Sequence, residues 1–96
     1  MATAAKTVYP HITKDPQICS GRPCVEGTRI RVVDVLALHE EGLSPEHIVE
    51  EFTTLHGPAD VYAALLYYHD HKAEIEADLE KDQAITEEYE REHRGR

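Results

Sequence analysis

The chain has 96 residues, which is enough for one small domain and no more. Apolar residues make up 41% of it and tryptophan is absent, so we expect a modest core without a deep substrate pocket. Its longest apolar run, residues 63–68, is far shorter than the roughly 20 residues that cross a bilayer. The first six residues lack the apolar stretch of a secretory signal, and a cytoplasmic location is therefore expected.

The net charge of −9 is unevenly divided along the chain. Residues 1–32 carry five basic against two acidic side chains, a net +3, whereas residues 33–96 carry 17 acidic against five basic ones, a net −12. Such asymmetry is informative about partners rather than about the fold. It predicts that an anionic polymer approaches only the N-terminal third, and that a basic protein surface prefers the remainder.

The N-terminal third is expected to be extended. Residues 1–10 are predicted to form a flexible leader that precedes a domain spanning residues 11–79. Two short strands, residues 22–25 and 28–32, flank Glu26-Gly27, where glycine supplies the positive φ of a tight turn. We predict a small hairpin in which Arg29 and Arg31 face outward and Ile30 faces a core.

Two helices are predicted next. The first runs from about Val32 to Glu41 and ends at Gly42 as a left-handed cap. The second begins with Ser44 as N-cap and Pro45 at the first helical position, and it ends near residue 53.

A third helix is predicted to start at Pro58, with Asp60 in its first turn. Its exposed positions are expected to be Asp60, Tyr62, Tyr67 and Asp70. No helix-breaking residue follows until Gly95, so the helical pattern continues into an extended C-terminal helix. Residues 80–96 are mostly charged, and two apolar side chains do not offset the ordering entropy of such a segment. We therefore expect an acidic accessory tail that protrudes or frays and orders on a partner.

Few residues suggest chemistry. Cys19 and Cys24 are five positions apart, and in a reducing compartment two free thiols are expected. A disulfide would require the four intervening residues to fold the chain back. Consecutive helical residues such as His69 and Asp70 point about 100° apart and do not converge on one metal ion. We predict no catalytic, cofactor or metal site and no enzymatic activity.

The order of the second and third helices is that of a helix-turn-helix, whose last helix enters the DNA major groove. The third helix offers few basic residues, so phosphate contacts would have to come from the hairpin. The predicted DNA-binding residues are Arg22, Arg29, Arg31, Tyr67 and Lys72.

The run G-R-P-C-V-E-G-T-R-I-R-V, residues 21–32, resembles the first motif of domain-of-unknown-function family 433 (DUF433). Residues 41–48 and 61–68 are similar to its later motifs, and the resemblance covers about residues 11–79. Residues 53–58, T-T-L-H-G-P, depart from the pattern, because the family commonly has a proline before an L-T step at this place. The resemblance implies a mainly α, homeodomain-like three-helix fold with an N-terminal β arm. It also implies kinship with VapB-type antitoxins, which are encoded beside a PIN-like ribonuclease toxin.

These features predict an antitoxin-like protein that neutralises a PIN-like toxin and, as a second partner, binds operator DNA. The alternatives are a stand-alone helix-turn-helix regulator and an adaptor that binds proteins only. The unpaired hairpin edge predicts a homodimer. The C-terminal helix is expected to lie in a groove of the toxin, with one terminal arginine against its catalytic acids. The predicted toxin-binding residues are Ile75, Leu79, Ile85, Tyr89, Arg91, Arg94 and Arg96.

Overall fold

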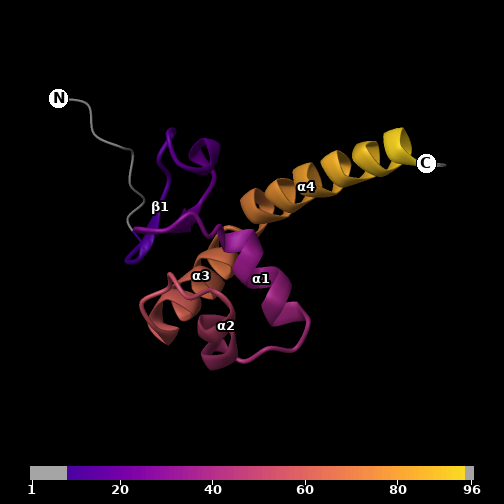
Figure 1. Ribbon diagram of the computed structural model, residues 1–96. Coiled ribbons are helices and arrows are strands. Elements are labelled where there is room, and N and C mark those ends of the chain that lie inside the picture. The colour runs from indigo at the N-terminus through magenta and orange to yellow at the C-terminus, as the bar shows by residue number, and fades with distance from the viewer. Residues whose placement is uncertain (1–8, 95–96) are drawn as a thin grey trace.

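The computed structural model describes residues 9–94 and is mainly helical, with a small antiparallel pair of strands at the N-terminal end (Figure 1). The elements, in chain order, are β1 (Ile12–Thr13), a short 3-10 turn (Cys19–Gly21), β2 (Cys24–Val25), α1 (Val32–Glu40), α2 (Pro45–Glu51), α3 (Pro58–Asp70) and α4 (Lys72–His93). No helix among the described residues is both long enough and apolar enough to span a membrane.

The strands differ from the predicted hairpin in their pairing. β2 forms its ladder with β1, where Ile12 lies opposite Val25 and Thr13 opposite Cys24. The predicted second strand, residues 28–32, contributes only one bridge, between Cys24 and Arg31. The tight turn itself is present, because Gly27 has φ +83° and the Thr28 amide donates to the Val25 carbonyl at 3.0 Å.

The boundary between α1 and α2 follows the predicted signals. Gly42 has φ +103°, and its amide donates to the carbonyl of His39 at 3.0 Å. The next amide, of Leu43, donates to Leu38 at 3.2 Å, which completes a Schellman motif. The Ser44 hydroxyl then accepts from the His47 amide at 3.2 Å and caps α2.

The core lies between α1, α2, α3 and the strands, and its fully buried members are mostly β-branched. α3 packs against both α1 and α2, and the start of α4 closes the core with Ile75. Tyr9, the only described residue of the predicted leader apart from Pro10, also packs on this core. The core residues are Ile12, Val25, Val32, Val33, Val35, Leu36, Ile48, Leu55, Val61, Ala64, Tyr67 and Ile75.

The prediction that the helix continues without a break after Pro58 is wrong. The chain turns at His71, which separates α3 from α4. The backbone of His71 has φ −136° and ψ 47°, and its ring stacks on Tyr67 with centroids 4.2 Å apart. Tyr9 packs edge-on against both rings, at 5.0 Å from Tyr67 and 5.3 Å from His71. This aromatic cluster holds a corner that no glycine or proline marks in the sequence.

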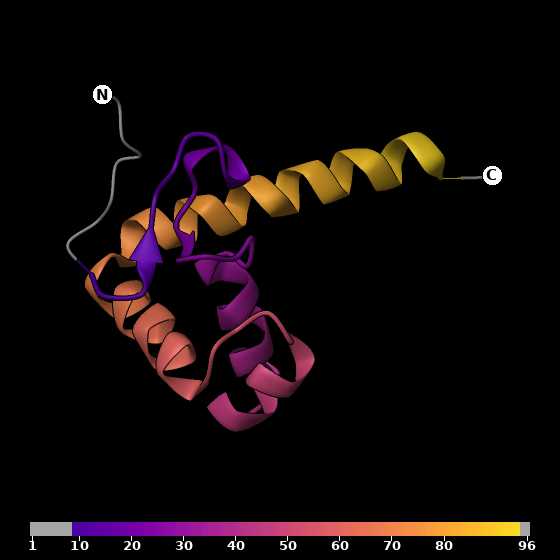
Figure 2. The same cartoon turned by 60° about the vertical axis from the view of Figure 1, so that its left-hand side comes forward.

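The distal part of α4 leaves the body of the molecule and extends into solvent (Figures 1 and 2). Residues 80–93, which belong to the predicted acidic accessory tail, continue α4 without a break, and docking of this tail on a partner stays a prediction. Residues 1–8 of the predicted leader and residues 95–96 of the tail lie outside the described residues.

Two isoleucines of α4 differ in burial and allow the contribution of core packing to stability to be measured. Ile75 is fully buried and Ile85 is 65% exposed. We expect Ile75→Ala to lower the free energy of unfolding by about 2–5 kcal/mol, because it empties a buried site. Ile85→Ala is the matched control and should change it by less than about 0.5 kcal/mol. Urea unfolding followed by circular dichroism measures both, and equal losses would contradict the observed burial.

Candidate functional site

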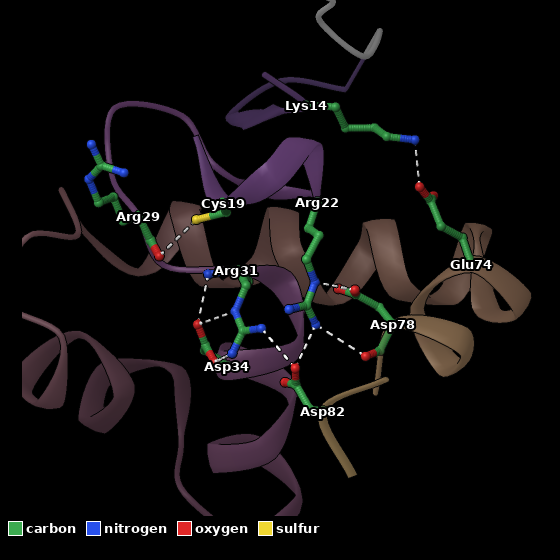
Figure 3. A network of polar contacts seen from close by, with 9 residues as sticks. All are labelled: Lys14, Cys19, Arg22, Arg29, Arg31, Asp34, Glu74, Asp78 and Asp82. Carbon is green, nitrogen blue, oxygen red and sulfur yellow. Dashed lines mark hydrogen bonds and ion pairs between the residues drawn. The ribbon is translucent and has the colours of Figure 1, made fainter. Parts of the chain in front are cut away.

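The most connected polar cluster joins the N-terminal loop to α4 through Arg22 (Figure 3). The Arg22 side chain is 20% exposed, and its Nε donates to the Asp78 carboxylate, which is 6% exposed. One terminal nitrogen of the same guanidinium donates to the Asp78 carbonyl at 3.1 Å and to Asp82 Oδ1 at 2.9 Å. Arg22 therefore holds two successive turns of one face of α4.

A second arginine, Arg31, reaches the same carboxylate. Its guanidinium donates to Asp82 Oδ1 at 3.1 Å and to Asp34 Oδ1 at 2.8 Å. The backbone amide of Arg31 donates to Asp34 Oδ2 at 3.0 Å, which also caps the first turn of α1. Asp82 thus receives hydrogen bonds from both arginines and ties α1 to α4. We call Arg22, Arg31, Asp34, Asp78 and Asp82 the arginine clamp.

The charges of the clamp are stabilised by one another. Desolvation alone would raise the pKa of Asp82, but the hydrogen bonds and positive charges of Arg22 and Arg31 outweigh it and lower that pKa. The hydrogen bond to Asp34 is the main reason that the pKa of Arg31 is raised above its ordinary value. For Arg22, the hydrogen bonds that it donates to Asp78 and Asp82 outweigh desolvation and raise the pKa. Arg22, Arg31 and Asp82 are therefore ionised at neutral pH.

A neighbouring pair extends this contact along α4. Lys14 donates to Glu74 at 2.5 Å, and the buried hydroxyl of Tyr67 donates to the other oxygen of Glu74 at 2.7 Å. Desolvation is the largest influence on Glu74, but these two hydrogen bonds reverse it and lower its pKa. Burial in turn raises the pKa of Tyr67.

The clamp changes the interpretation of the predicted DNA-binding residues. Arg22 and Arg31 are engaged with carboxylates, whereas the side chain of Arg29 is exposed. Lys72 is exposed, with its Nζ 6.0 Å from the centre of the Tyr68 ring. Tyr67, which was expected on the exposed face of α3, is only 2% exposed and belongs to the core.

Asp60, also expected to be exposed, is buried at the start of α3. Its carboxylate accepts from the His56 amide at 2.9 Å and contacts the Nδ1 atoms of His11 and His56 at 2.9 and 3.3 Å.

Residues 9–94 contain no group of three or more His, Cys, Asp or Glu side chains that could hold a metal ion.

The predicted toxin-binding residues fall into two groups. Ile75 is fully buried in the core, so the prediction that it faces a partner is wrong, whereas Leu79 is only partly buried and its contact with a partner stays a prediction. Ile85 and Tyr89 are 65% and 61% exposed on the distal part of α4. Arg91 and Arg94 are exposed near its end, and Arg96 lies outside the described residues.

The exposed pair continues the face by which α4 is clamped. Residues seven apart on an α-helix lie within about 20° of the same direction. Ile85 follows Asp78 by seven positions and Tyr89 follows Asp82 by seven. Tyr89 stacks on His93 with centroids 3.9 Å apart, and His93 Nδ1 lies 2.8 Å from the Tyr89 carbonyl. The exposed apolar side chains of α4 therefore begin beyond the turns that the clamp holds.

Sequence reasoning missed Asp78 and Asp82 as partners of the hairpin arginines. The available signal was their spacing of four, which places both carboxylates on one helical face, together with the opposite charges of the two chain regions. Nothing in the sequence pairs them with Arg22 and Arg31, because that contact spans more than 50 residues.

The clamp predicts a stability difference between two arginines on either side of β2. Arg22→Ala leaves the Asp78 carboxylate buried without its cation and should lower the free energy of unfolding by about 3 kcal/mol. Arg29→Ala is the control and should cost less than about 0.5 kcal/mol, because its side chain is exposed. Urea unfolding at pH 7 compares them, and a loss for Arg29→Ala as large as for Arg22→Ala would contradict the clamp.

The contribution of Asp82 should depend on pH. Because folding lowers the pKa of Asp82, its stabilisation is complete above the unfolded pKa of about 3.9 and is lost as the pH falls through the folded value. Urea unfolding of wild type and Asp82→Asn across a pH series should therefore show a gap that is constant near neutrality and closes below about pH 4. A gap that stays constant in acid would exclude this pH dependence.

Comparison with known proteins identifies the family to which this chain belongs. The family model described as "Protein of unknown function (DUF433)" matches residues 12–68. A crystal structure of a DUF433 member from Anabaena variabilis ATCC 29413 is similar, with a TM-score of 0.64 and 25% sequence identity. The similarity covers 71% of this chain and 66% of that chain, and no curated protein matches. Because the family model matches more than half of the 96 residues, this chain belongs to the DUF433 family.

Proposed function

We propose that this protein is an antitoxin-like binding protein whose distal α4 docks in a groove of a PIN-like ribonuclease toxin. The observation that carries the proposal is the exposed pair Ile85 and Tyr89, which lie four residues apart on one face of a helix that projects from the body. Amphipathic helices that dock in grooves use such i, i+4 anchors. Tyrosine is among the residues enriched at the centres of protein interfaces.

The surrounding charges favour a basic partner surface. Four glutamates flank the pair, at positions 87, 88, 90 and 92, and two arginines, Arg91 and Arg94, lie near the end of α4. Complementary charge steers association and fixes orientation. A guanidinium at the helix end is suited to carboxylates that a nuclease gathers around its metal ions. In this proposal Ile85 and Tyr89 supply affinity and the terminal arginines block the catalytic acids.

Operator DNA is the weaker partner in this proposal. Phosphate binding depends on free Lys and Arg side chains, and the carboxylates of the clamp neutralise Arg22 and Arg31. Of the residues predicted to contact DNA, Arg29 and Lys72 remain exposed. A protein-binding role therefore has more support than a stand-alone helix-turn-helix regulator. The expected homodimer stays a prediction.

The docking proposal is tested by co-expression of the full chain with a tagged PIN-like ribonuclease encoded by a neighbouring gene. The double variant Ile85→Ala/Tyr89→Ala should bind at least tenfold more weakly in calorimetry, because it removes both apolar anchors. It should also fail to rescue growth of cells that express the toxin, while its urea unfolding stays close to wild type.

The matched control is Tyr62→Ala/Leu66→Ala, an i, i+4 apolar pair on α3 in which each side chain is 55% exposed. This variant should bind and neutralise like the wild type. Equal loss in both variants, or loss in the α3 variant alone, would move the docking surface away from distal α4. A genome without a PIN-like neighbour would count against the antitoxin role and favour an adaptor with another partner.

A further inference from the structure

The two cysteines come together although neither belongs to the proposed docking surface. Cys19, Ser20 and Gly21 all have positive φ, at 54°, 58° and 79°, and form a short left-handed turn. The Gly21 amide donates to the Ile18 carbonyl at 3.1 Å, and the amide that follows donates to Cys19 at 3.0 Å. The turn folds residues 20–23 back, as a disulfide between Cys19 and Cys24 would require.

Both thiols point at the same loop. Cys19 Sγ donates to the Arg29 carbonyl at 3.3 Å, and Cys24 Sγ donates to the Thr28 carbonyl at 3.7 Å. The two carbonyls belong to consecutive residues, so both thiols lie against the same short segment of the chain.

The environments of the two sulfurs differ. Cys24 is fully buried in β2, whereas Cys19 is partly exposed in the turn. Desolvation, reinforced by the neighbouring Cys19, raises the pKa of Cys24 to about 11, so this thiol stays protonated at neutral pH. An oxidant in solution meets Cys19 first, and Cys24 lies behind it as a second thiol. This is the arrangement of a peroxide-reactive cysteine with a resolving partner.

We propose that Cys19 and Cys24 form a modification site for hydroperoxides, which convert the pair to a reversible intramolecular disulfide. The Cys19 thiolate attacks one oxygen of hydrogen peroxide, the O–O bond breaks, and hydroxide leaves and takes up a proton to form water. Cys19 is then a sulfenic acid. The Cys24 sulfur attacks the Cys19 sulfur, the S–O bond breaks, and a second water leaves with the Cys24 proton. Two thiols and one peroxide thus give one disulfide and two waters.

The disulfide would enclose Arg22, since the ring spans residues 19–24. Arg22 is the side chain that holds α4 through Asp78 and Asp82. Oxidation would therefore act on the segment that fixes α4 to the body. The chemistry of the pair does not depend on the proposed toxin partner, and its test uses this chain alone.

The experiment treats the reduced full-length chain with hydrogen peroxide, alkylates the remaining thiols and measures the intact mass. The expected product is a monomer lighter by about 2 Da that takes up no alkyl group, and dithiothreitol restores two alkylation sites. A disulfide-linked dimer, or a chain that retains two alkylatable thiols at a peroxide excess sufficient to oxidise free cysteine, would overturn the proposal.

Two variants assign the roles within the pair. Cys24→Ser should stop at the sulfenic acid of Cys19, which dimedone traps as a stable adduct. Cys19→Ser should oxidise at least tenfold more slowly than wild type, because the remaining thiol is buried and protonated. Circular dichroism checks that both are folded. Oxidation of Cys19→Ser at the wild-type rate would show that Cys24 is the reactive thiol and would refute the order of steps.

Discussion

The direction of α4 depends on one guanidinium. Arg22 is the point at which the N-terminal loop, Asp78 and Asp82 meet, and it contacts α4 over two turns of one face. Ile75 anchors the start of the same helix in the core. A helix fixed by an apolar contact at one turn and by ion pairs at the next two has little freedom to pivot. The position of its distal end, and of any surface it carries, follows from that attachment.

The clamp also accounts for much of the uneven charge of the chain. A basic N-terminal third and an acidic remainder suggest separate external partners, but Arg22 and Arg31 are paired with Asp34, Asp78 and Asp82 inside the molecule. Part of the asymmetry is therefore an intramolecular interaction between residues distant in sequence. The family model ends at residue 68, so the clamp joins the matched domain to a helix that follows it. Charge that remains exposed, including the glutamates of distal α4, is what a partner would meet.

The features that sequence predicted correctly have local causes. Gly42, Ser44 and Pro45 end α1 and begin α2 through contacts within a few residues, so the two boundaries were predictable. The corner at His71 was not, because it depends on Tyr9, which lies 62 positions earlier. Burial of Asp60 likewise depends on His11, 49 positions away. The arginine clamp belongs to the same class, since long-range packing rather than local preference places its side chains.

The apolar periodicity of α4 does not predict which of its apolar side chains are buried and which are exposed. The actual division between them affects how a partner would bind. Ile75, Ile85 and Tyr89 belong to one stripe, but the body of the molecule covers only its first part. A free peptide as short as the distal segment would be a marginal helix, because nucleation is costly. Here the clamped half supplies the nucleus and the distal turns only propagate it. A partner that binds Ile85 and Tyr89 would meet side chains already held at helical spacing, so less ordering entropy would oppose docking than for a disordered tail.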